Sequence, residues 1–124
     1  MPVHYTLRDQ GGFVHIRATG RFTSAEIQIC LSRLATDPNL KTDHVTLFDT
    51  TGAESEAIDD EEFGEALRLE GQSKERLVAK KWAILVKDRR FVRHALAYQR
   101  ASVAMGQPTE VFASLVEATH WLSH

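Results

Sequence analysis

At 124 residues the chain has the length of one compact domain, and we expect a single domain over residues 1–124. Its 17 acidic residues outnumber its 15 lysines and arginines, and the formal net charge of −2 gives no general attraction to nucleic acid or to an anionic membrane. A single cysteine, Cys30, excludes an internal disulfide. No apolar run approaches the roughly 20 residues of a membrane helix. These features predict a cytoplasmic domain without metal or other cofactor.

The N-terminal third predicts a hairpin followed by a helix. Residues 3–8 and 14–19 each alternate between apolar and polar side chains on either side of a glycine turn, which predicts an antiparallel hairpin with one face in water. His15 falls on that polar face, so we expect it to face solvent. Thr23 and Glu26 have the spacing of a capping box, so a helix should follow. Its apolar stripe, which should bury Cys30, is Ile27, Cys30, Leu31 and Leu34.

Strand and helix patterns alternate through the rest of the chain. We predict strands at 45–49, 81–87 and 109–112 and helices at 58–70, 91–104 and 115–122. The last helix opens after Ser114 with a second capping-box pattern and should bury Leu115, Ala118 and Leu122. The resulting order, β-β-α-β-α-β-α-β-α, predicts an α/β fold with right-handed crossovers and a mixed, mostly parallel sheet.

Several stretches, in this order, resemble the STAS superfamily, and within it the SpoIIAA-like branch of STAS/SEC14 domain proteins. The resemblance implies a SpoIIAA-like fold over nearly the whole chain. It also implies one of two roles, either protein docking switched by phosphorylation or an apolar cavity for a lipid-like molecule. The stretches that carry it are Ile16–Gly20, Leu47–Asp49, Ala83–Val86, Glu110–Ser114 and Glu117–Leu122.

Polar residues follow two of the predicted inner strands, and the carboxyl ends of such strands are where α/β sheets receive ligands and partners. The candidate binding residues are Asp49, Thr50, Thr51, Asp88, Arg89 and Arg90. The arginines are suited to a phosphate or carboxylate group. The alternative interpretation is structural: Asp49 caps a turn, Thr50 bonds the local backbone, and the arginines lie at a solvated helix start.

These patterns favour a non-enzymatic module that docks a protein partner through the carboxyl edge of the sheet and the adjacent charged helix, with a homodimer as one arrangement. One alternative is a carrier of a small apolar ligand beneath the predicted 58–70 helix, lined by Phe63, Leu67 and Leu69. Another is a regulator switched by phosphorylation of Thr50 or Thr51. We expect neither catalysis nor nucleic-acid binding, because the sequence lacks a nucleophile elbow, a phosphate-binding glycine loop and interleaved basic and aromatic residues.

Overall fold

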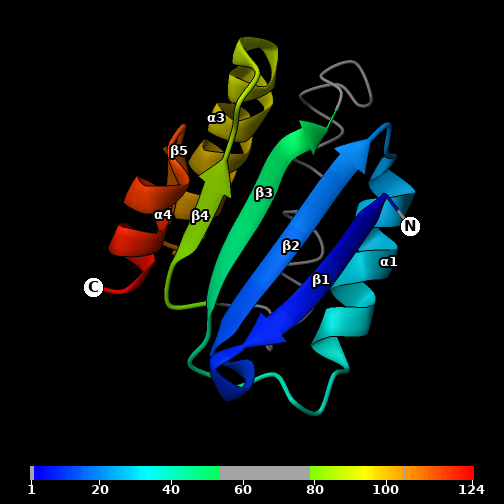
Figure 1. The fold of residues 1–124 in the computed structure, drawn as a ribbon, viewed down its shortest axis with the longest axis vertical. Helices are drawn as coiled ribbons and strands as arrows, with labels where there is room; N and C mark the ends of the chain where they lie inside the picture. The colour runs from blue at the N-terminus through cyan, green and yellow to red at the C-terminus, as the bar shows by residue number, and fades with distance from the viewer. Residues whose placement is uncertain (1, 54–78, 105) are drawn as a thin grey trace.

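The computed structural model describes residues 2–53, 79–104 and 106–124 (Figure 1). The predicted 58–70 helix lies outside them. In chain order, the elements are β1 (Val3–Arg8), the 3-10 turn η1 (Asp9–Gly11), β2 (Phe13–Gly20), α1 (Ser24–Ala35), β3 (Val45–Ala53), β4 (Trp82–Leu85), α3 (Arg89–Ala104), β5 (Thr109–Phe112) and α4 (Leu115–Leu122).

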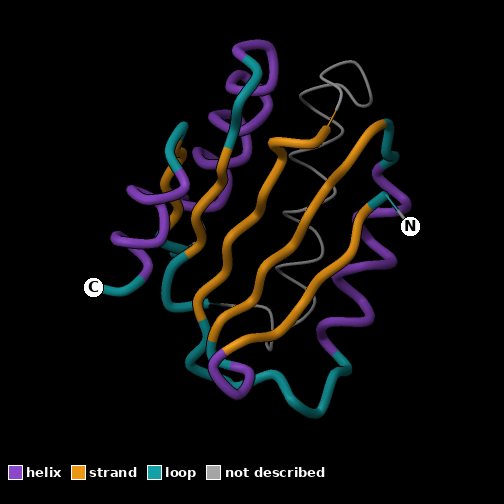
Figure 2. The backbone as a smooth tube through the Cα atoms, viewed as in Figure 1, coloured by secondary structure: helices purple, strands orange, loops and turns teal. Residues whose placement is uncertain are grey.

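The five strands form one sheet in the order β1-β2-β3-β4-β5, which Figure 2 shows as a continuous layer. Strand β1 pairs antiparallel with β2, and the other neighbouring pairs are parallel. The predicted hairpin and the mostly parallel sheet are therefore confirmed.

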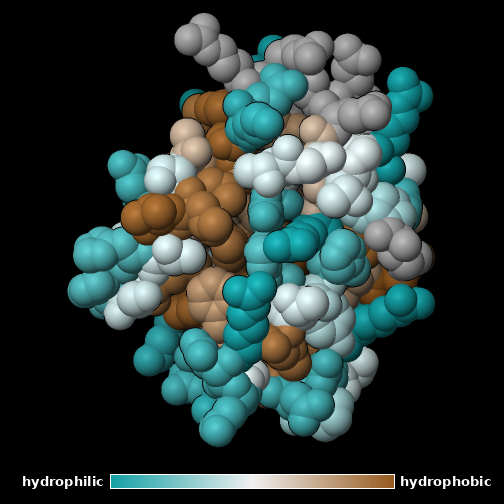
Figure 3. All heavy atoms as spheres, in the orientation of Figure 1, coloured by the Kyte–Doolittle hydropathy of each residue, from teal (hydrophilic) through white to brown (hydrophobic). Residues whose placement is uncertain are grey.

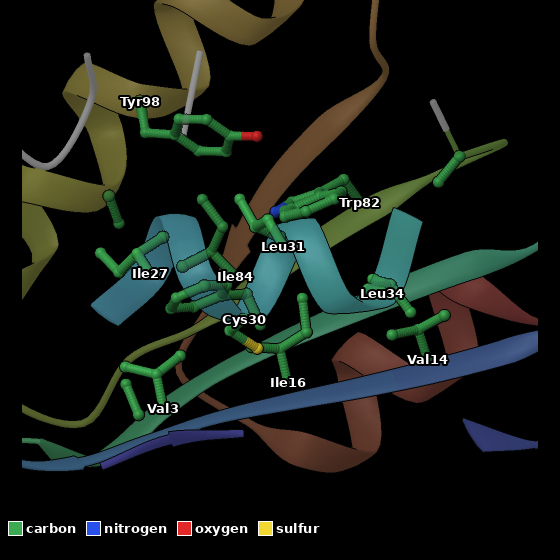
Figure 4. Packing of buried hydrophobic residues seen from close by; sticks show 14 of the residues in the cluster. Val3, Val14, Ile16, Ile27, Cys30, Leu31, Leu34, Trp82, Ile84 and Tyr98 are labelled. Carbon is green, nitrogen blue, oxygen red and sulfur yellow. The ribbon is translucent and has the colours of Figure 1, made fainter. Parts of the chain in front are cut away.

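Helices lie on both faces of this sheet (Figure 1). Helices α1 and α3 share one core with the back of the sheet, where Ile16 and Ile84 meet Leu31 and Tyr98 (Figure 4). Helix α4 closes a smaller core on the opposite, front face, where Ala118 and Leu122 pack on side chains of β3 and β4. Strand β4 thus buries both of its faces, which explains its continuous apolar run.

The helix starts follow the predicted capping chemistry. The Thr23 hydroxyl accepts the Glu26 amide, and the Glu26 carboxylate accepts the Thr23 amide, so the predicted capping box is present. Before α4, the Ser114 hydroxyl accepts the Glu117 amide at 3.3 Å. Each cap satisfies an amide that the helix itself leaves unpaired.

Three predictions about individual residues were wrong. Strand β3 does not end at Asp49 but continues to Ala53, because Thr19 and Gly20 of β2 pair with its last residues. Leu115 is 52% exposed rather than buried, since α4 turns only Ala118 and Leu122 fully toward the sheet. His15 does not face solvent: it is 6% exposed and lies beside Asp49.

Candidate functional site

The parallel pairing of β3 with β4 brings two predicted site segments to one edge of the sheet. Asp49 lies opposite Leu85, and Asp88 follows Leu85 by three residues. Helix α3 begins directly afterwards, at Arg89. In Figure 1 the arrowheads of β3 and β4 point to this same edge. The carboxyl edge therefore gathers the ends of two inner strands and the start of a helix.

Asp49 is held by three hydrogen bonds at the boundary between β2 and β3. Its Oδ2 is 3.1 Å from His15 Nε2. Its Oδ1 accepts the Thr51 amide at 2.9 Å and the Thr51 hydroxyl at 2.6 Å. His15 and Asp49 are neighbours because β2 and β3 pair in parallel, with Arg17 directly opposite Asp49 and His15 two residues earlier on the same face. The carboxylate thus has a fixed orientation.

Burial and hydrogen bonding set the charges of this cluster. Burial lowers the pKa of His15 below its ordinary value, and the hydrogen bond to Asp49 opposes this effect only in part. Burial raises the pKa of Asp49, but hydrogen bonds from Thr51 and His15 outweigh it and hold that pKa below its ordinary value. At neutral pH the cluster is therefore a neutral imidazole that donates from Nε2 to a charged carboxylate.

The two adjacent threonines have different environments. Thr50 is 3% exposed, and its hydroxyl donates to the backbone oxygen of Leu85 at 2.8 Å, which joins β3 to β4. Thr51 is exposed. The difference arises because successive residues of a strand point to opposite faces of the sheet. A register shift lies at the same point, between Arg17 and Thr19, where β3 has one residue more than β2. Of these two hydroxyls, that of Thr51 is thus the accessible one.

A shallow hollow lies next to this cluster, with a volume of about 190 Å³. It lies where β2 and β3 diverge at the register shift, and both charges that line it come from facing positions of these strands. Pockets that enclose a small molecule have volumes of about 300–1,000 Å³. The hollow is therefore smaller than a pocket that encloses a whole small molecule. The residues that line it are Arg17, Ala18, Thr19, Asp49, Thr51 and Gly52.

The structure places only part of the predicted site. Asp49, Thr50 and Thr51 lie together in β3, and Asp88 lies beyond β4 at the same edge. Arg89 and Arg90 begin α3, but their side chains are outside the described part of the molecule. The apolar-cavity candidates Phe63, Leu67 and Leu69 are also outside the described residues, so the lipid-like ligand stays a prediction.

Sequence reasoning missed His15 and Arg17 as site residues. Both lie at alternate positions of β2, on the face that carries Asp49 on β3. The signal was present in the alternation of residues 14–19, but it becomes informative only once β2 is known to neighbour β3. Antiparallel pairing of β2 with β1 alone places these side chains on a wet face, which is what the sequence predicted.

Two general features of the described residues limit the site further. Among residues 2–53, 79–104 and 106–124, no three histidine, cysteine, aspartate or glutamate side chains gather as a metal site would require. None of the helices in that same part of the chain is long and apolar enough to cross a membrane. Cys30 is buried, and burial raises the pKa of its thiol to about 11, so it is protonated at neutral pH.

Comparison with known proteins places the fold. No protein-family model matches the chain, and no curated protein gives a significant match. Among solved structures, the chain is similar to an uncharacterized protein of the DUF3478 family with a SpoIIAA-like fold, from Shewanella loihica PV-4. The TM-score is 0.60 at 19% sequence identity, over 97% of this chain and 91% of that one. The chain thus has a SpoIIAA-like fold, which confirms the fold that the resemblance implied.

Proposed function

We propose that the protein is a non-enzymatic binding module that docks a protein partner at the carboxyl edge of its sheet. The observation that carries the proposal is the convergence of Asp49 and the β4–α3 junction at one edge. Asp49 lies opposite the exposed Arg17, so a partner meets both signs of charge within one strand spacing. Opposite charges that are fixed in position favour specificity in protein recognition.

Two further observations support protein docking over the binding of a small molecule at this edge. The hollow beside Asp49 is smaller than an ordinary small-molecule pocket, whereas a protein partner needs only a surface with one or two such depressions. The His15–Asp49–Thr51 hydrogen bonds hold the carboxylate in place before any partner arrives, which lowers the entropy cost of binding. Phosphorylation of Thr51 would remove its hydrogen bond to Asp49 and place two negative groups side by side, so it would disturb this surface rather than complete it.

A charge-reversal series in the full chain tests the docking surface. The chain is isolated with its partner from the cell in which it is naturally made, and the partner is quantified against the bait. We expect Arg17→Glu, and separately the double variant Arg89→Glu/Arg90→Glu, to reduce the bound partner at least tenfold. Arg100→Glu is the matched control, because Arg100 is exposed on the same helix but near its other end. Equal capture by all four proteins would reject this surface.

A further inference from the structure

The outer edge of β1 is open in the described part of the molecule. Strand β1 is the first strand of the sheet and pairs with β2 on one side only. The opposite edge of the sheet differs: β5 has only four residues, and the Gln99 side chain already donates to the Thr109 backbone oxygen at 2.9 Å. The six residues of β1 span about 20 Å, which is long enough to pair with another strand.

The hydrogen-bond register shows which backbone groups of β1 point outward. The Thr19 amide donates to the Pro2 oxygen at 2.8 Å, so these two residues form a hydrogen-bonded pair. Such pairs alternate along an antiparallel ladder. His4, Thr6 and Arg8 therefore direct their amide and carbonyl groups to β2. The groups of Val3, Tyr5 and Leu7 point to the open edge.

We propose that this edge pairs with β1 of a second copy, antiparallel about a two-fold axis at Tyr5, to give one continuous sheet. The outward-pointing residues then meet each other, Tyr5 opposite Tyr5 and Val3 opposite Leu7. On the front face His4 lies opposite Thr6, and Arg8 lies opposite Pro2. Apolar side chains meet apolar ones in this register, and no two like charges are opposed, so the strand is complementary to itself.

Helix α1 borders the same edge. It packs behind β1, and Figure 1 shows it along the outer side of that strand. Its Ile29 is 44% exposed, whereas the stripe toward the core is buried. Ile29 is two residues from both Ile27 and Leu31, about 200° around the helix from each of these buried residues, so it lies on the side of α1 that faces away from the sheet. A second copy paired with β1 would therefore cover the half-buried Tyr5 and Leu7 rather than Ile29.

The first test measures the oligomeric state of the full chain by sedimentation velocity over a range of concentrations. We expect a concentration-dependent species of twice the 14.0 kDa chain mass. Leu7→Pro removes an outward amide and leaves the bonds to β2 in place, so it should raise the dimer dissociation constant at least tenfold. Leu7→Val keeps the amide and should dimerise like the natural chain. Circular dichroism confirms that each variant is folded.

The second test determines the register of the paired strands with cysteines at exposed positions, where substitution should not disturb folding. His4→Cys and Thr6→Cys are prepared separately, mixed, and oxidised. Because residue 4 lies opposite residue 6 of the partner, we expect a disulfide-linked dimer in the mixture and little in either variant alone. The natural chain, whose Cys30 is buried, is the control. Three results would overturn the proposal: a monomer at all concentrations, a dimer unaffected by Leu7→Pro, or cross-linking of one variant alone as strong as that of the mixture. A monomer would mean that the edge is available to an extended segment of another protein instead.

Discussion

The two halves of the sheet are built differently. Strands β3 to β5 have α4 on their front face and the core of α1 and α3 on their back, and all four residues of β4 are buried. Among the described elements, no helix covers the front of β1 and β2, and every second residue of β1 is exposed there. In Figure 3, which views this front, hydrophobic side chains gather toward α4 and hydrophilic ones cover much of the rest. Both halves bury their back face in the same core, so the covered half, β3 to β5, and the open half differ on the front, where β1 and β2 are available for contacts.

The largest difference between the halves should appear in a truncation of the covered half. Ile84 is fully buried in β4, so Ile84→Ala should lower the free energy of unfolding by about 4 kcal/mol, near the upper end for such a change. Thr6→Ala, on the exposed face of β1, should change it by less than about 0.5 kcal/mol. Urea denaturation measures both. Similar losses for the two variants would contradict the burial of Ile84 and the exposure of the front of β1.

The open half contains one closely packed point, where η1 meets the loop before β3. A Cβ on Gly11 would lie 1.8 Å from the Asn39 backbone oxygen, and its φ of +91° is unfavourable for any other residue. Gly11→Ala should therefore cost about 3 kcal/mol, from strain and overpacking together. Gly106 has a φ of +90° with open space around it, so Gly106→Ala should cost only about 1 kcal/mol. Thermal unfolding of the two variants separates the cost of the contact with Asn39 from the cost of the positive φ, which both glycines share. Equal losses of stability would show that Asn39 can move aside.

A smaller effect is expected at the boundary between the halves. Asp49→Asn removes charged hydrogen bonds and should cost about 2 kcal/mol at pH 7. The pKa of Asp49 is lowered in the folded state, so its contribution is present above the unfolded pKa and is lost as the pH falls through the folded value. As the pH falls below about 4, the stability of Asp49→Asn should therefore decrease less than that of the natural chain. Parallel acid-induced unfolding curves for the two proteins would contradict a charged, bonded Asp49.

His15 extends this dependence to milder acid. Because its pKa is also lowered by folding, the unfolded chain binds its proton first, and stability falls as the pH drops below about 6.5. His15→Gln should remove this part of the curve between about pH 7 and pH 5. The other histidines remain in both proteins, so the difference between the two curves reports His15 alone.

Local patterns predicted most of the fold, and tertiary pairing decided what they missed. The alternation of residues 3–8 and the cap at Thr23 depend on neighbours in the sequence, and both were predicted correctly. The end of β3 was not, because Thr50-Thr51-Gly52 has the composition of a turn and becomes strand only through its pairing with β2. The burial of His15 depends on the same pairing. The binding role of the site residues stays a prediction.

The extra residue at the register shift in β3 has a consequence for how relatives of this chain could diverge. Thr50 and Thr51 lie between Asp49 and Gly52, where β2 has only Ala18. If either threonine were deleted, the two strands would match in length, and the remaining threonine would directly follow Asp49 in the buried position of Thr50. A lineage that lost one codon here would keep a threonine at this point and yet present no hydroxyl to the outside.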